Sequence, residues 1–138
     1  MTVLVFGMTV VGCDDGNDDT SYFDTLNLST AAPTDAALSA GGLTQTQFDQ
    51  IRDAAGGGFQ GWAIEDGGLT MAWTGRSLSN FNSVADVLHE LLTENDRENA
   101  SGVHSAWGNS YDLMFSPERI SDGGFYLPAG SMMAHFFQ

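Results

Sequence analysis

Three histidines and many carboxylates are the residues whose chemistry first suggests a reactive or metal-binding site. His89, His104 and His135 stand in a chain with 18 aspartates and glutamates. No two of these histidines are three or four residues apart, the spacing at which a helix presents two ligands to one zinc ion. His89 is followed by Glu90, but Thr93 occupies the position where a zinc-protease helix needs its second histidine. The sequence therefore predicts no metal site, and we expect His89 to be a solvated surface residue.

Two further motifs fail because their spacing is wrong. The run DDGNDD at residues 14–19 is rich in carboxylates, but it lacks the glycine and the glutamate that an EF-hand loop places at its sixth and twelfth positions. The three glycines at 56–58 are followed by no lysine of the kind that a phosphate-binding loop requires, so they indicate the end of a helix. The chain also has no G-x-S-x-G motif of a serine hydrolase. We therefore assign no catalytic residue and no cofactor.

The tryptophans are the candidate ligand-contact residues. Alternation predicts a β-hairpin over residues 59–74, with its turn at 66–68, and places Trp62 and Trp73 on the same face as Ile64. Such a face is either an exposed aromatic platform for a peptide or glycan, or part of the core beneath the helices. Trp107, farther along the chain, is the third candidate.

Two amphipathic helices must position these residues. The first is predicted to begin at Thr44, with Gln47 as its capping-box partner, and to end at the three glycines. The second is predicted to begin at a capping pair of Ser83 and Asp86. Its apolar residues follow the spacing of one helix face and are Val84, Val87, Leu88, Leu91 and Leu92.

Strand and turn signals dominate from residue 102 onward. Residues 111–115 alternate between apolar and polar side chains, and 122–124 form a turn. Residues 125–127 and 131–137 are predicted to pair as a closing hairpin around 128–130. The sequence therefore predicts an α+β fold, in which two amphipathic helices pack on a mainly antiparallel sheet of about four to six short strands.

The charge balance excludes several kinds of partner. The formal net charge is −14, with four arginines and no lysine. A nucleic-acid-binding surface is disfavoured because almost no side chain can neutralise phosphates. Electrostatic attachment to anionic lipid is disfavoured for the same reason. Any membrane attachment must therefore come from a lipid chain on the protein.

The first thirteen residues, MTVLVFGMTVVGC, form an uncharged, mostly apolar run that ends at the only cysteine. Val10, Val11 and Gly12 before Cys13 resemble the lipobox of bacterial lipoproteins, and the wider string FGMTVVGCDDG resembles the leaders of spirochaete lipoproteins. The resemblance implies cleavage before Cys13 and acylation of this residue, palmitate included. It also implies a lipid-anchored protein of the bacterial cell envelope, on the outer membrane and facing the periplasm or the cell surface.

A signal peptide begins with a basic region, whereas the first basic residue here is Arg52. We therefore interpret residues 1–12 as a truncated signal peptide, residues 13–42 as an acidic flexible tether and residues 43–138 as a single α+β domain. The alternative is that residues 2–12 form a buried N-terminal strand.

Three functions follow from these interpretations. We favour a non-enzymatic envelope module that binds a protein, peptide or glycan. The alternatives are an envelope hydrolase with a dispersed carboxylate and histidine site, and an intracellular interaction module whose N-terminal strand is part of the fold.

Overall fold

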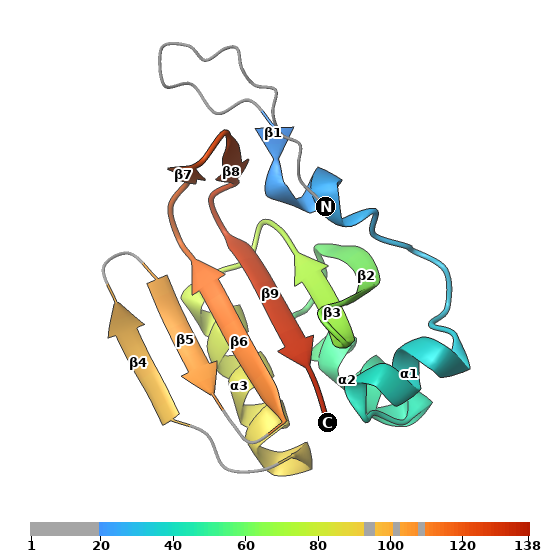
Figure 1. Ribbon diagram of the computed structural model, residues 1–138. Helices are drawn as coiled ribbons and strands as arrows, with labels where there is room; N and C mark the ends of the chain where they lie inside the picture. Colours follow the sequence, from blue (N-terminus) through green and yellow to red (C-terminus); the bar gives the residue numbers. More distant parts are fainter. Residues whose placement is uncertain (1–19, 93–95, 101–102, 108–109) are drawn as a thin grey trace.

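The structure has an α+β architecture, as the alternation and helix periodicity predicted. The computed structural model describes residues 20–92, 96–100, 103–107 and 110–138. Within these residues it contains one more α-helix than the two that we expected. The elements, labelled in Figure 1, are β1 (Thr20–Ser21), the 3-10 helix η3 (Tyr22–Leu26), α1 (Asp35–Gly41), α2 (Gln45–Ala54), β2 (Phe59–Glu65), β3 (Gly68–Trp73), α3 (Leu78–Leu91), β4 (Asp96–Ala100), β5 (Val103–Trp107), β6 (Tyr111–Ser116), β7 (Ile120–Asp122), β8 (Phe125–Leu127) and β9 (Ser131–Phe136).

Helix α2 begins at the predicted capping box. The Thr44 hydroxyl accepts a hydrogen bond from the Gln47 backbone N–H at 3.1 Å, and the Gln47 side chain accepts one from the Thr44 backbone N–H at 3.0 Å. These bonds satisfy donors that a helix start leaves without partners. Gly56 follows the helix with a φ of +78°, a left-handed conformation that ends it at small cost.

Helix α3 begins earlier than predicted. Its N-cap is Ser77 rather than Ser83, and the Asn80 side chain accepts a hydrogen bond from the Ser77 N–H at 2.8 Å. The predicted pair of Ser83 and Asp86 is therefore wrong. Asparagine at the third helical position performs the task that glutamate or glutamine usually has there. The early start adds a buried phenylalanine to the apolar stripe, whose buried members are Phe81, Val84, Ala85 and Leu88.

Strands β2 and β3 form the predicted hairpin. Asp66 and Gly67 both have positive φ, +52° and +75°, as a type I′ two-residue turn requires. Trp62 lies opposite Met71, so the two strands share an apolar face as expected. Ile64 is nevertheless 52% exposed, because β2 is an edge strand of its sheet.

The larger sheet has six antiparallel strands in the order β2-β3-β9-β6-β5-β4, so the last strand of the chain lies between β3 and β6. A smaller sheet has the order β1-β8-β7 and lies beyond the upper ends of β6 and β9 (Figure 1). The predicted closing hairpin is therefore wrong, because β8 pairs with β7 and β1 while β9 pairs with β3 and β6. Alternation identified both strands correctly, but it does not specify which strand each one pairs with.

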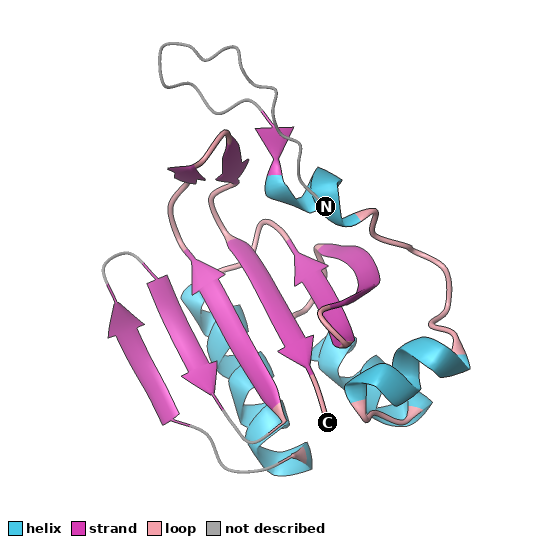
Figure 2. Cartoon of the chain, in the orientation of Figure 1, coloured by secondary structure: helices cyan, strands magenta, loops and turns pink. Residues whose placement is uncertain are grey.

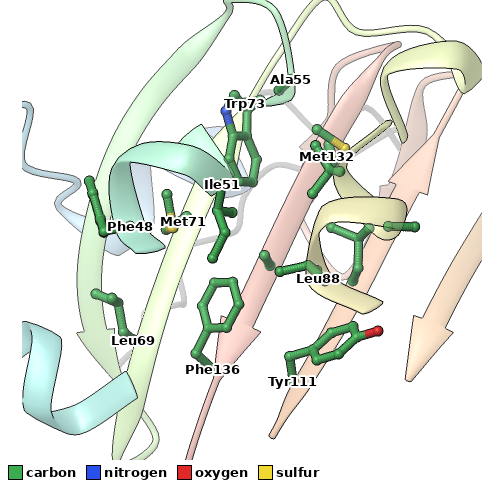
Figure 3. Packing of buried hydrophobic residues seen from close by; sticks show 14 of the residues in the cluster. Phe48, Ile51, Ala55, Leu69, Met71, Trp73, Leu88, Tyr111, Met132 and Phe136 are labelled. Carbon is green, nitrogen blue, oxygen red and sulfur yellow. The ribbon is translucent and has the colours of Figure 1, made fainter. Parts of the chain in front are cut away.

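The core lies between the six-stranded sheet and the helices. In Figure 2, α2 and α3 lie behind this sheet. Ile51 of α2 and Leu88 of α3, which are both fully buried, project toward the central strands (Figure 3). Alternate residues of these strands face the helices and are buried: Leu69, Met71, Trp73, Tyr111, Leu113, Phe115, Met132, Ala134 and Phe136.

We interpreted residues 20–42 as part of a flexible tether. This prediction is wrong, because these residues include β1, η3 and α1. Residues 13–19 lie outside the described part of the chain. Ser29 and Trp62 form a bridge of two backbone hydrogen bonds, at 2.8 and 3.0 Å. The Thr34 hydroxyl caps α1, and Ala37 of this helix is fully buried. The low-complexity composition concealed a short helix that packs through its small residues.

Candidate functional site

The face of the six-stranded sheet opposite α2 and α3, which we call the open face, carries polar side chains on its central strands. Thr70 of β3 lies directly opposite His135 of β9, which in turn lies opposite Asp112 of β6. Residues paired in this way project from the same side of a sheet, with Cβ atoms about 4.5–5.5 Å apart. The next row along the open face contains Met133 and Met114. Register therefore creates a polar row beside an apolar one.

A chain of hydrogen bonds runs through this polar row. The Thr70 hydroxyl lies 3.0 Å from Oε1 of Glu65 and 2.9 Å from Nδ1 of His135. A hydroxyl has one proton, and a carboxylate can only accept, so the Thr70 O–H donates to Glu65 and Nδ1–H of His135 donates to Thr70. In neutral His135 this arrangement leaves Nε2 without a proton. Thr70 is 2% exposed and orients the imidazole from the neighbouring strand through this hydrogen bond.

Two adjoining cavities lie over the open face. The polar one has a volume of about 310 Å³ and contains the hydrogen-bonded chain of Glu65, Thr70 and His135. The apolar one has a volume of about 530 Å³ and lies against the smaller sheet. Both sizes fall near or within the usual range of ligand sites. Tyr22 and Met133 line both cavities, so the two share a wall. The remaining apolar lining is Ile120, Gly123, Phe125, Tyr126 and Leu127.

The pKa of Tyr22, in η3, is affected by the burial and the negative charge at the polar cavity. Burial raises the pKa of its hydroxyl, and the nearby carboxylates of Glu65 and Asp66 raise this pKa further. Desolvation disfavours a phenolate, and negative neighbours disfavour it again. Asp112 adds another carboxylate to the lining, whereas no arginine lines either cavity within the described residues. The polar cavity therefore favours a positively charged group.

The structure places the three histidines in different environments. His89 is exposed on α3, as expected. His104 lies on the helix-covered side of the sheet. The centroid of its ring is 6.0 Å from that of Phe81 and 5.9 Å from that of Phe115. Of the three, His135 is the one in the candidate site. Among the described residues, no three His, Cys, Asp or Glu side chains are grouped closely enough to hold a metal ion.

The candidate aromatic platform is not on the surface. Trp73 is fully buried and Trp62 is 9% exposed, so both belong to the core beneath the helices. The Trp62 indole N–H donates a hydrogen bond to the Ala31 carbonyl at 2.8 Å. The side chain of Trp107 lies outside the described residues, as do Cys13 and the lipobox residues Val10, Val11 and Gly12.

Sequence reasoning did not identify Tyr22, Glu65, Thr70 and Asp112 as site residues. A usable signal existed for Asp112, because this carboxylate interrupts an apolar alternation on a strand that the sequence did predict. For the others no local signal existed. Thr70 and His135 are 65 positions apart and come together through strand pairing alone.

The arrangement suits both binding and proton transfer. An imidazole fixed at Nδ1 presents Nε2 as an acceptor or, when protonated, as a donor.

None of the helices in the described residues has the length and apolar character that crossing a bilayer requires. Comparisons of the chain with protein-family models, curated protein sequences and solved structures find no match.

Proposed function

We propose that this protein is a lipid-anchored module of the bacterial cell envelope that binds a ligand on the open face of its six-stranded sheet. The observation that carries the binding function is the pair of adjoining cavities, which combine an apolar wall with convergent polar groups. Ligand sites commonly have this composition. The anchoring rests on the resemblance of residues 10–13 to a lipobox.

The chemistry of the polar row favours binding over catalysis. The Thr70 hydroxyl lies within hydrogen-bond distance of His135, but it donates its proton to Glu65 in a hydrogen bond rather than to the imidazole, and Thr70 is almost completely buried. A nucleophile must instead be exposed to substrate and hydrogen-bonded to a base that can take its proton. The Glu65, Thr70 and His135 chain is therefore arranged to orient the imidazole rather than to activate the hydroxyl.

An envelope hydrolase is the second candidate, because His135 lines the polar cavity and its neutral ring has an unprotonated Nε2, which can act as a general base toward a bound water molecule. This candidate predicts that ester or peptide substrates are turned over by the wild type and not by His135→Gln. Equal background rates for both proteins would exclude His135 as the base.

The anchoring is tested on the mature protein isolated from the membranes of the cells that produce it. Intact-mass analysis should find a chain that begins at Cys13 and carries the mass of its acyl groups, because two or more chains are needed for stable anchoring. Palmitate labelling should be lost in Cys13→Ser. An unmodified thiol at Cys13, with residues 1–12 still attached, would contradict the lipoprotein assignment.

A further inference from the structure

We infer that the ligand of the open face is a peptide segment that carries a lysine or arginine side chain beside a bulky apolar side chain. This inference rests on the proposed binding function and adds the chemistry of the ligand. It places the cationic group in the polar cavity and the apolar group in the adjoining one.

The polar cavity provides the acceptors for a cation. Glu65 uses Oε1 to accept from Thr70, and its second carboxylate oxygen is not used in that bond. Asp66 and Asp112 also line this cavity. A protonated amine or guanidinium donates several hydrogen bonds to such oxygens, and charge-assisted bonds of this kind are about twice as strong as neutral ones.

The apolar cavity requires a second, different group. Among the described residues its lining is aromatic and aliphatic and includes no carboxylate to pair with an amine. Arg119 stacks on the Tyr126 ring at 4.4 Å, so this ring already contacts a cation of the protein itself. Because Tyr22 and Met133 line both cavities, one ligand can reach both with neighbouring side chains.

The negative charge of this protein favours a ligand from another molecule over a segment of its own chain or of a second copy. Residues 14–19, which precede β1, include four aspartates, and a second copy of the protein has a net charge of −14. Both would bring negative charge toward Glu65, Asp66 and Asp112. A neutral glycan is disfavoured because it offers no positive charge to the carboxylates of Glu65, Asp66 and Asp112.

The test uses the full-length protein and fluorescein-labelled octapeptides in a glycine and serine background. The first peptide carries one lysine two positions from a phenylalanine. In matched peptides, norleucine replaces the lysine, glutamate replaces the lysine, or glycine replaces the phenylalanine. Fluorescence anisotropy should show the tightest binding for the first peptide, and each replacement should weaken binding by roughly tenfold.

Matched variants locate the interaction. The double variant Glu65→Gln with Asp112→Asn should weaken binding of the first peptide by roughly tenfold or more. The control, Glu90→Gln with Glu118→Gln, has the same net charge but alters exposed residues that do not line either cavity. It should bind as the wild type does. Equal binding by the two double variants would overturn the inference, because attraction to the overall negative charge would then explain the affinity.

The outcomes separate this inference from the proposed function. If the norleucine or glutamate peptide binds as tightly as the lysine peptide, and Met133→Ala weakens both, the open face binds a ligand but not a cationic one. If no peptide binds at millimolar concentration, the peptide inference is overturned. If neither Met133→Ala nor the double variant of Glu65 and Asp112 changes the binding of any peptide that does bind, the proposed use of the open face is overturned as well.

Discussion

Two truncations test where the folded domain begins. Removal of residues 1–19 should leave the free energy of unfolding unchanged, because residues 1–12 resemble a signal peptide that is cleaved and the charged run at 14–19 has no apolar side chain to bury. Removal of residues 1–42 should lower it strongly, because this change also deletes η3 and α1. The two deletions therefore distinguish a domain that starts near residue 20 from one that starts at residue 43.

The expected loss follows from the contacts of residues 20–42. Three hydrogen bonds join this segment to Trp62, two through Ser29 and one through Ala31. They contribute about 1 kcal/mol each, and more where a buried group is left without a partner. Helix α1 also covers Leu69 and Phe136, since a Cβ atom added at Gly41 would lie 2.9 and 3.2 Å from their Cβ atoms. Uncovering part of these two side chains costs roughly 2 kcal/mol more.

The total is about 5 kcal/mol, which is comparable to the entire stability of many domains. Urea unfolding followed by tryptophan fluorescence measures it. Trp62→Phe removes the indole hydrogen bond to Ala31 together with part of the buried ring system, and should cost about 1–3 kcal/mol. If the protein without residues 1–42 unfolded cooperatively at the same urea concentration as the protein without residues 1–19, the packing of α1 described above would be refuted. Unfolding after removal of residues 1–19 alone would instead support a structural N-terminal strand.

Two further predictions concern the core and the polar cavity. Leu88→Ala should lower the unfolding free energy by about 2–5 kcal/mol because it leaves a cavity under α3, whereas Leu78→Ala, at a position that is 43% exposed, should cost less than about 1 kcal/mol in the same calorimetric assay. Tyr22 has a raised pKa in the folded state, so its contribution to stability is full below the unfolded pKa of about 10 and is lost as pH rises through the folded pKa. Tyr22→Phe should therefore flatten the fall in urea midpoint above about pH 10, and an unchanged slope would contradict this. Glu65→Gln should lower the Tyr22 pKa in an ultraviolet titration, with the Tyr22→Phe spectrum subtracted.

Local signals in the sequence predicted the elements that are specified locally. The capping box of Thr44 and Gln47 defines the start of α2 within four residues of chain, and the alternation of 111–115 defines β6 by itself. Helix α1 was missed because alanine, serine and glycine reduce apolar contrast, even though Thr34 and Asp35 are favourable residues at a helix start. Short helices of this kind depend on tertiary packing, which no local pattern records.

The candidate site was less predictable than the fold because its residues come from separate segments. Asp112 and His135 are both on predicted strands, but only the pairing of β6 with β9 places them opposite one another. The sequence analysis instead paired β9 with β8, as the two strands of a closing hairpin. The error in strand pairing therefore also concealed the site.

The position of the site explains why the open face is both polar and partly apolar. In the polar row, Asp112 is exposed and His135 is half-buried, so both can be hydrated, whereas the buried Thr70 is satisfied by its hydrogen bonds. Toward the smaller sheet, Met133 is partly buried and lines the apolar cavity together with Tyr22. The two cavities lie at this boundary, where solvated carboxylates meet an apolar wall. An amphipathic cation matches such a boundary better than an anion or a purely apolar ligand, because it can satisfy both sides at once.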